Sequence, residues 1–153
     1  MKHSKAVKAV NAAIARCEEN GIRLTERRRQ LLETILGQAR PVSAYELVEA
    51  VREDHAARVP VMTVYRVLDL FAEAGIVHKL RSSNSYTACA HLACSHVHDA
   101  PQFLICEECA EVEELDTRKR DIERMTREAR EIGFHVRDRQ LEIYGVCKRC
   151  AAG

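Results

Sequence analysis

The chain has 153 residues, of which 46% are hydrophobic and 31% are charged, and its formal net charge is +1. This length fits one domain or two small ones, and no apolar run approaches the roughly 20 residues of a membrane-spanning helix. The charged, amphipathic start MKHSKAVKAVNAAIARCEENG has no signal-peptide pattern, so we expect a cytoplasmic protein without a membrane partner.

The net charge conceals an asymmetry between the two halves of the chain. Residues 1–88 carry 14 Lys and Arg against 10 Asp and Glu, whereas residues 89–153 carry 10 against 13. A basic first half indicates a surface that faces a polyanion, although an ordinary solvated surface could look similar.

The first half shows four helical patterns followed by two short strands. Apolar stripes predict helices over residues 4–19, after the N-cap candidate Thr25, after a capping box of Ser43 and Glu46, and over residues 60–74. Strand-like segments follow at residues 76–80 and 86–90. This order predicts a winged helix-turn-helix, in which the last helix enters the DNA major groove.

The second half is organised around cysteines and histidines. Two C-x2-C units, one formed by Cys106 and Cys109 and the other by Cys147 and Cys150, can close a tetrahedral four-thiolate zinc site. A redox-active dithiol is the alternative for such pairs. Cys17 lies on the first helical stripe and is predicted to be buried core.

The elements around these cysteines predict a small α/β unit. Strands are expected at residues 103–105, 112–115 and 134–144, and a helix capped by Asp116 and Thr117 should run to about residue 132. About 50 residues of this kind make a thin core, so a zinc ion or a partner subunit is expected to stabilise it.

Six motifs together resemble the ferric uptake regulator family of metal-sensing repressors, and most closely its zinc-responsive branch. They are RLTERRRQLLETIL, VSAYELVEAV, VMTVYRVLDLFAEAGIVHKL, NSYTAC, FLICEECAEVEEL and IYGVCKRC. The resemblance implies an α+β fold: a winged helix-turn-helix over residues 1–88, a hinge over 89–95 and an α/β dimerisation domain over 96–153. It also implies a homodimer that binds operator DNA when it carries zinc and represses zinc uptake genes.

The resemblance also implies at least two zinc ions per subunit. Cys106, Cys109, Cys147 and Cys150 would form the structural site. The regulatory zinc would be held by His78, Cys89, His98 and Glu114, with His96 as the alternate to His98. His91, Cys94 and His96 could form an additional metal site or be hinge residues without a role.

For DNA, the resemblance assigns base reading to Tyr45 and Arg66. An Arg can bond bidentately to guanine, and an aromatic ring can pack on a thymine methyl. Tyr65 could grip a phosphate or pack against the wing, and Thr63 is a further candidate contact. Arg27 and Arg28 sit in the first turn of the second helix, where they could contact phosphates or simply be solvated.

Two other functions are weighed against this one. A zinc enzyme would need an open metal position and a nearby base, and the sequence has neither H-E-x-x-H nor H-x-E ahead of a C-x2-C, so we expect no catalytic residues and no small organic substrate. A protein of the same fold that senses iron, manganese or peroxide is the closer alternative. A thiolate at Cys89 favours zinc over ferrous iron.

Overall fold

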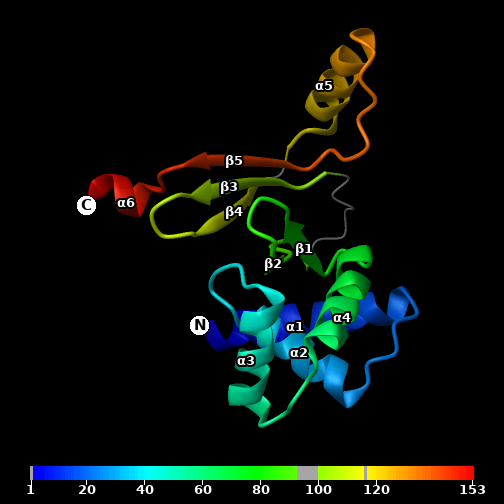
Figure 1. Cartoon of the computed structure of the whole chain (residues 1–153), viewed down its shortest axis with the longest axis vertical. Helices are drawn as coiled ribbons and strands as arrows, with labels where there is room; N and C mark the ends of the chain where they lie inside the picture. The colour runs from blue at the N-terminus through cyan, green and yellow to red at the C-terminus, as the bar shows by residue number, and fades with distance from the viewer. Residues whose placement is uncertain (1, 93–99, 116) are drawn as a thin grey trace. The chain divides into compact units, whose positions relative to one another are not determined.

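A computed structural model describes residues 2–92, 100–115 and 117–153 of the chain. By its internal contacts the chain divides into two compact units, Met1–Cys94 and Ser95–Gly153 (Figure 1). Within the described residues, no helix is both long and apolar enough to span a membrane.

The first unit begins with four helices, as the sequence predicts. They are α1 (Lys2–Glu19), α2 (Glu26–Leu36), α3 (Ala44–His55) and α4 (Val61–Glu73). The Thr25 side chain caps α2 by accepting a hydrogen bond from the backbone N–H of Arg28 at 3.4 Å. Ser43 and Glu46 form the predicted capping box of α3, in which each side chain accepts from the other residue's backbone N–H at 3.1 and 2.7 Å. These caps fix where the helices start.

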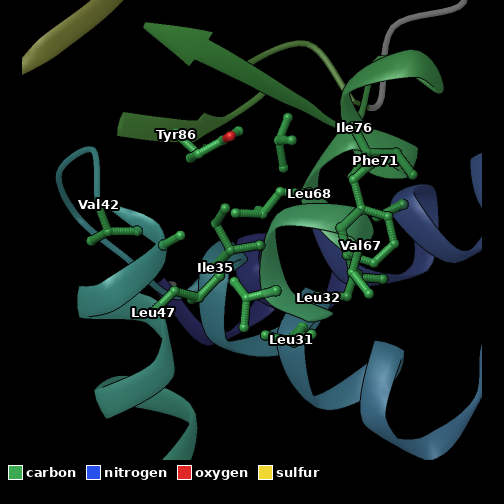
Figure 2. Packing of buried hydrophobic residues seen from close by; sticks show 14 of the residues in the cluster. Leu31, Leu32, Ile35, Val42, Leu47, Val67, Leu68, Phe71, Ile76 and Tyr86 are labelled. Carbon is green, nitrogen blue, oxygen red and sulfur yellow. The ribbon is translucent and has the colours of Figure 1, made fainter. Parts of the chain in front are cut away.

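The apolar faces of these helices share one core. Figure 2 shows that side chains of α2, α3 and α4 point toward one another, among them Leu32, Leu47 and Phe71. Cys17 of α1 is fully buried in the same cluster, which confirms its prediction as core. The core therefore fixes the rotation of each helix and decides which residues of α4 face outward.

A two-stranded ribbon, the wing, follows α4. Strands β1 (Val77–Leu80) and β2 (Ser85–Ala88) pair antiparallel after a turn in which Gly75 has φ +67°. Tyr86 of the wing exchanges two backbone hydrogen bonds with Val42, at 3.0 and 2.8 Å, which ties the ribbon to the segment before α3. Helices followed by this ribbon confirm the winged helix-turn-helix.

The second unit is a three-stranded sheet with two helices. Its elements are β3 (Gln102–Cys106), β4 (Val112–Leu115), α5 (Lys119–Glu131), β5 (Leu141–Gly145) and α6 (Lys148–Ala152). The strand order is β4-β3-β5, with β4 antiparallel and β5 parallel to the central β3 (Figure 1).

Two predicted boundaries in this unit are wrong. Helix α5 begins at Lys119 with Arg118 as its N-cap, so Thr117 does not cap it, and Asp116 lies outside the described residues. The last strand begins at Leu141 rather than at residue 134. The Asp138 carboxylate accepts from the backbone N–H of Gln140 at 3.0 Å, so a local turn replaces the strand there. Helix α6 was not predicted.

The second unit has a small core. Among its described residues, the buried apolar side chains are only those of Phe103, Cys106 and Ile122. Large apolar side chains remain exposed on β4, α5, β5 and the segments that follow the last two: Leu115, Met125, Ile132, Phe134, Leu141, Ile143, Tyr144 and Val146. Burial of so few apolar side chains stabilises a unit of this size only weakly.

Candidate metal sites and nucleic-acid interface

The first C-x2-C unit is a tight backbone loop at the end of β3. The N–H of Cys106 donates to the carbonyl of Glu111 at 2.9 Å, and the N–H of Ala110 donates back to the carbonyl of Cys106 at 3.0 Å. Ala110 takes the left-handed conformation with φ +59°, which closes the loop. Cys106 and Cys109 are thereby held on one short loop.

The parallel pairing of β5 with β3 delivers the second C-x2-C unit to the first. Cys106 lies opposite Gly145 in the ladder, two residues before Cys147. The backbone N–H of Cys147 donates to the Cys106 sulfur at 3.3 Å, and the sulfurs of Cys109 and Cys147 are 3.7 Å apart. One ligand atom from each of the four cysteines lies within 4.8 Å of the others.

This geometry fits a zinc ion. Tetrahedral coordination with Zn–S bonds of about 2.3 Å places sulfurs about 3.8 Å apart. Backbone N–H donors, first that of Cys147, lower the pKa of the Cys106 thiol to about 6. Hydrogen bonds to the sulfurs of Cys147 and Cys109 raise the pKa of Cys150 instead. Without a metal the Cys106 thiol therefore ionises more readily than the Cys150 thiol, whereas a zinc ion would deprotonate both.

Arg149 borders this cluster and was not singled out from the sequence. Its guanidinium forms an ion pair with Glu111 at 2.8 Å and approaches the Cys109 sulfur at 4.0 Å. Four thiolates around Zn2+ carry a net negative charge, so a cation at this distance stabilises the loaded site. The position of Arg149 between Cys147 and Cys150 is the sequence feature that could have indicated its closeness to the cluster.

The wing brings together one pair of predicted ligands for the regulatory zinc. His78 pairs with Thr87 in the ribbon, and Cys89 follows two residues later, with its N–H donating to the carbonyl of Ile76 at 2.9 Å. His78 and Cys89 therefore form a diagonal pair on one face of the ribbon. A ring nitrogen of His78 and the Cys89 sulfur lie within 4.8 Å of each other.

The other predicted ligands belong to segments of the chain outside the wing. Glu114 is half-buried on β4, opposite Phe103. His91 is half-buried in the turn after the wing. Cys94, His96 and His98 lie outside the described residues, so the choice between His96 and His98 and the additional metal site stay predictions.

The predicted DNA contacts divide into exposed and partly buried residues. Tyr45 of α3 is 66% exposed, and Arg66 of α4 and Arg27 of α2 are exposed. Thr63 and Tyr65 are half-buried on α4. Arg28 is half-buried, and its guanidinium donates to the backbone carbonyl of Arg23 at 2.8 Å, so part of its donor capacity is used locally.

Arg66 differs from several other arginines of the first unit in having no ion-pair or hydrogen-bond partner among the described residues. By contrast, Arg29 pairs with Glu33 at 3.9 Å, Arg40 pairs with Glu46 at 3.0 Å, and Arg52 pairs with Glu49. In particular, no described contact joins Arg66 to Asp69 or Glu73, the acidic residues three and seven positions further along α4, so the structure shows no salt bridge that would occupy its guanidinium.

A winged helix joined to a unit with a four-cysteine cluster suited to zinc defines a class of metal-containing winged-helix proteins. Within that class, the chain belongs to the ferric uptake regulator family, whose sequence pattern matches residues 19–144.

Several relatives are similar over nearly the whole chain. The zinc uptake regulation protein of Escherichia coli K12 is 38% identical over 135 residues, which is 88% of this chain and 76% of that protein. The peroxide-responsive repressor PerR of Staphylococcus aureus Mu50 is 30% identical over 90% of this chain and 88% of its own length.

Solved structures agree with these sequence relatives. A zinc uptake regulator in complex with zinc and DNA is 30% identical, covers 96% of this chain and 95% of its own, and has a TM-score of 0.83. Holo XcZur is 39% identical with a TM-score of 0.79, over 94% of this chain and 97% of its own. The α+β fold and the family resemblance are thus confirmed.

Proposed function

We propose that this chain is a zinc-responsive transcriptional repressor that binds operator DNA and controls zinc uptake genes. The observation that carries the proposal is the similarity to a zinc uptake regulator solved with zinc and DNA, together with the four-cysteine cluster and the His78–Cys89 pair of the chain itself. The family is named for regulators, which supports a non-enzymatic role. Operator binding measured against free zinc concentration tests it, and affinity that does not change with zinc would contradict it.

The structural zinc belongs to Cys106, Cys109, Cys147 and Cys150 in this account. The sulfur spacing and the backbone donors to Cys106 support that assignment. Bound zinc would join the loop after β3 to the segment after β5, so it would hold the ends of these two paired strands together. Its role is therefore structural, since four protein ligands leave no open position for chemistry.

The regulatory zinc is held by His78 and Cys89 of the wing with Glu114 and His98 of the second unit. The diagonal pair of His78 and Cys89 supports the wing's contribution. A metal that takes ligands from both units would favour one arrangement of the units, and hence one placement of the two α4 helices in a dimer. Zinc then acts as a ligand with higher affinity for the DNA-binding arrangement, and DNA and zinc strengthen each other's binding.

An iron, manganese or peroxide sensor of the same fold is the second candidate. The similarity to the peroxide-responsive repressor PerR favours it. The thiolate of Cys89 argues against it, because soft sulfur ligands select zinc over ferrous iron or manganese. The identity of the metal that restores DNA binding separates the two.

The chain acts as a homodimer through its second unit. Many large apolar side chains of that unit are exposed, and only three apolar side chains are buried among its described residues. Both observations support this proposal, because a partner would cover apolar surface that the single chain leaves in water. Ile143→Asp, which places a charge at the middle of β5, is expected to yield monomers in sedimentation experiments. A dimer of unchanged stability would exclude β5 from the interface.

The base-reading role of Arg66 leads to a quantitative prediction. Arg66→Ala is expected to cost about 1–3 kcal/mol of binding to a specific operator and much less on random DNA, because bidentate guanine contacts discriminate between bases. Asp69→Ala, on the same exposed face of α4, is the matched control and should not weaken binding. Equal losses on operator and random DNA in fluorescence anisotropy would instead make Arg66 a phosphate contact.

A further inference from the structure

We propose that Met62 is a further specificity-determining residue, whose thioether contacts a thymine methyl beside the base pair read by Arg66. This inference rests on the proposed DNA-binding function. In a dimer, each of the two α4 helices would make this contact in its own half-site of the operator. Met62 lies off the apolar stripe of α4, and its side chain is exposed in the structure.

The rotation of α4 places Met62 outward. The helix buries Val64, Val67, Leu68 and Phe71 against the core, and Figure 2 shows the last three pointing inward. Met62 is 61% exposed. Arg66 follows it by four residues and is exposed as well, so the two side chains are neighbours on the helix surface.

The charge along this face indicates which end of α4 meets DNA. Its exposed positions continue with Asp69 and Glu73 in the C-terminal half, where carboxylates would repel phosphates. The N-terminal half carries Met62 and Arg66 and is preceded by the exposed Arg58. In helix-turn-helix proteins the N-terminal residues of the recognition helix contact base edges. Met62 lies in the first turn of α4, at the end that approaches the bases.

The chemistry of the residue selects the group that it contacts. Methionine offers no strong hydrogen bond, and the thymine 5-methyl is the apolar group displayed in the major groove. An unbranched thioether adapts its shape to such a group more readily than a branched side chain does. Arg66 supplies the hydrogen bonds to one base pair, and Met62 adds an apolar contact with a neighbouring thymine.

The test removes either the thymine methyl group or the Met62 side chain. An operator is first selected from a random duplex library with the zinc-loaded protein, and each thymine is then replaced in turn by deoxyuridine. We expect the wild type to lose affinity about fourfold at one thymine per half-site, the value for one buried methyl-sized group. Met62→Ala should bind the thymine operator about fourfold more weakly and show no further loss with deoxyuridine at that position. Met62→Leu should keep most of the sensitivity.

Two results would overturn the inference in different ways. If Met62→Ala keeps the wild-type sensitivity at every thymine while binding zinc and melting normally, Met62 reads no methyl group. If the wild-type protein enriches no sequence at all, the DNA-binding function itself is wrong. Because Met62 is exposed, its truncation should leave the fold of the first unit intact, and the melting temperature checks this.

Discussion

Replacing Cys109 by serine is expected to release one zinc ion per chain and to unfold the second unit. The four sulfurs of the loop between β3 and β4 and of the segment after β5 lie close enough for one zinc ion to join these segments. Only three apolar side chains are buried among the described residues of that unit. Zinc sites of this kind have apparent binding free energies of about 10–16 kcal/mol. The core cannot replace a contribution of that size.

The measurements are zinc content by atomic emission and thermal unfolding by circular dichroism. The helices α1 to α4 should remain folded in the variant, because their core in the first unit does not include the four cysteines. Cys17→Ala is the matched control: this thiol is buried in the first unit, and its loss should leave the zinc content unchanged. A Cys109→Ser protein with full zinc content and wild-type melting would show that the cluster is not a structural metal site.

Replacing Cys89 by serine is expected to abolish the zinc dependence of operator binding while the protein stays folded. Serine keeps the size of the side chain but removes the thiolate that suits zinc. Coupling free energies between two ligands typically correspond to about 5–150-fold in affinity, and this is the expected loss at zinc concentrations that saturate the wild type.

The control for Cys89→Ser is the zinc content of the variant, because the four-cysteine site should stay loaded. The four-cysteine site lies in the second unit, which does not contain Cys89. The variant should therefore keep one tightly held zinc ion, and its second unit should melt at the wild-type temperature. If Cys89→Ser still responds to zinc with the wild-type midpoint, Cys89 is not a ligand of the regulatory site. If instead all zinc is lost, the two sites are not independent.

The winged helix was predictable because local signals agree with its packing. Stripes of apolar residues define the faces of α2, α3 and α4, and the capping box of Ser43 and Glu46 marks the start of α3. The second unit was less predictable. Phe134 and Val136 alternate with polar residues as a strand would, but the turn at Asp138 keeps the chain out of the sheet until Leu141.

The candidate sites show the same division. The spacing of the four cysteines predicts their meeting, whereas the role of Arg149 depends on how α6 lies against the first loop. The pairing of His78 with Cys89 depends on the register of the wing, which one residue of slippage would destroy. The exposure of the Met62 side chain on α4 is a finding of the structure.

Zinc sensing is tested by measuring the metal content per chain together with operator binding at controlled free zinc, iron and manganese. We expect at least two zinc ions per chain and recovery of operator affinity with zinc alone. One fixed zinc ion with binding switched by iron or manganese would leave the four-cysteine site standing and contradict the assignment of a zinc sensor.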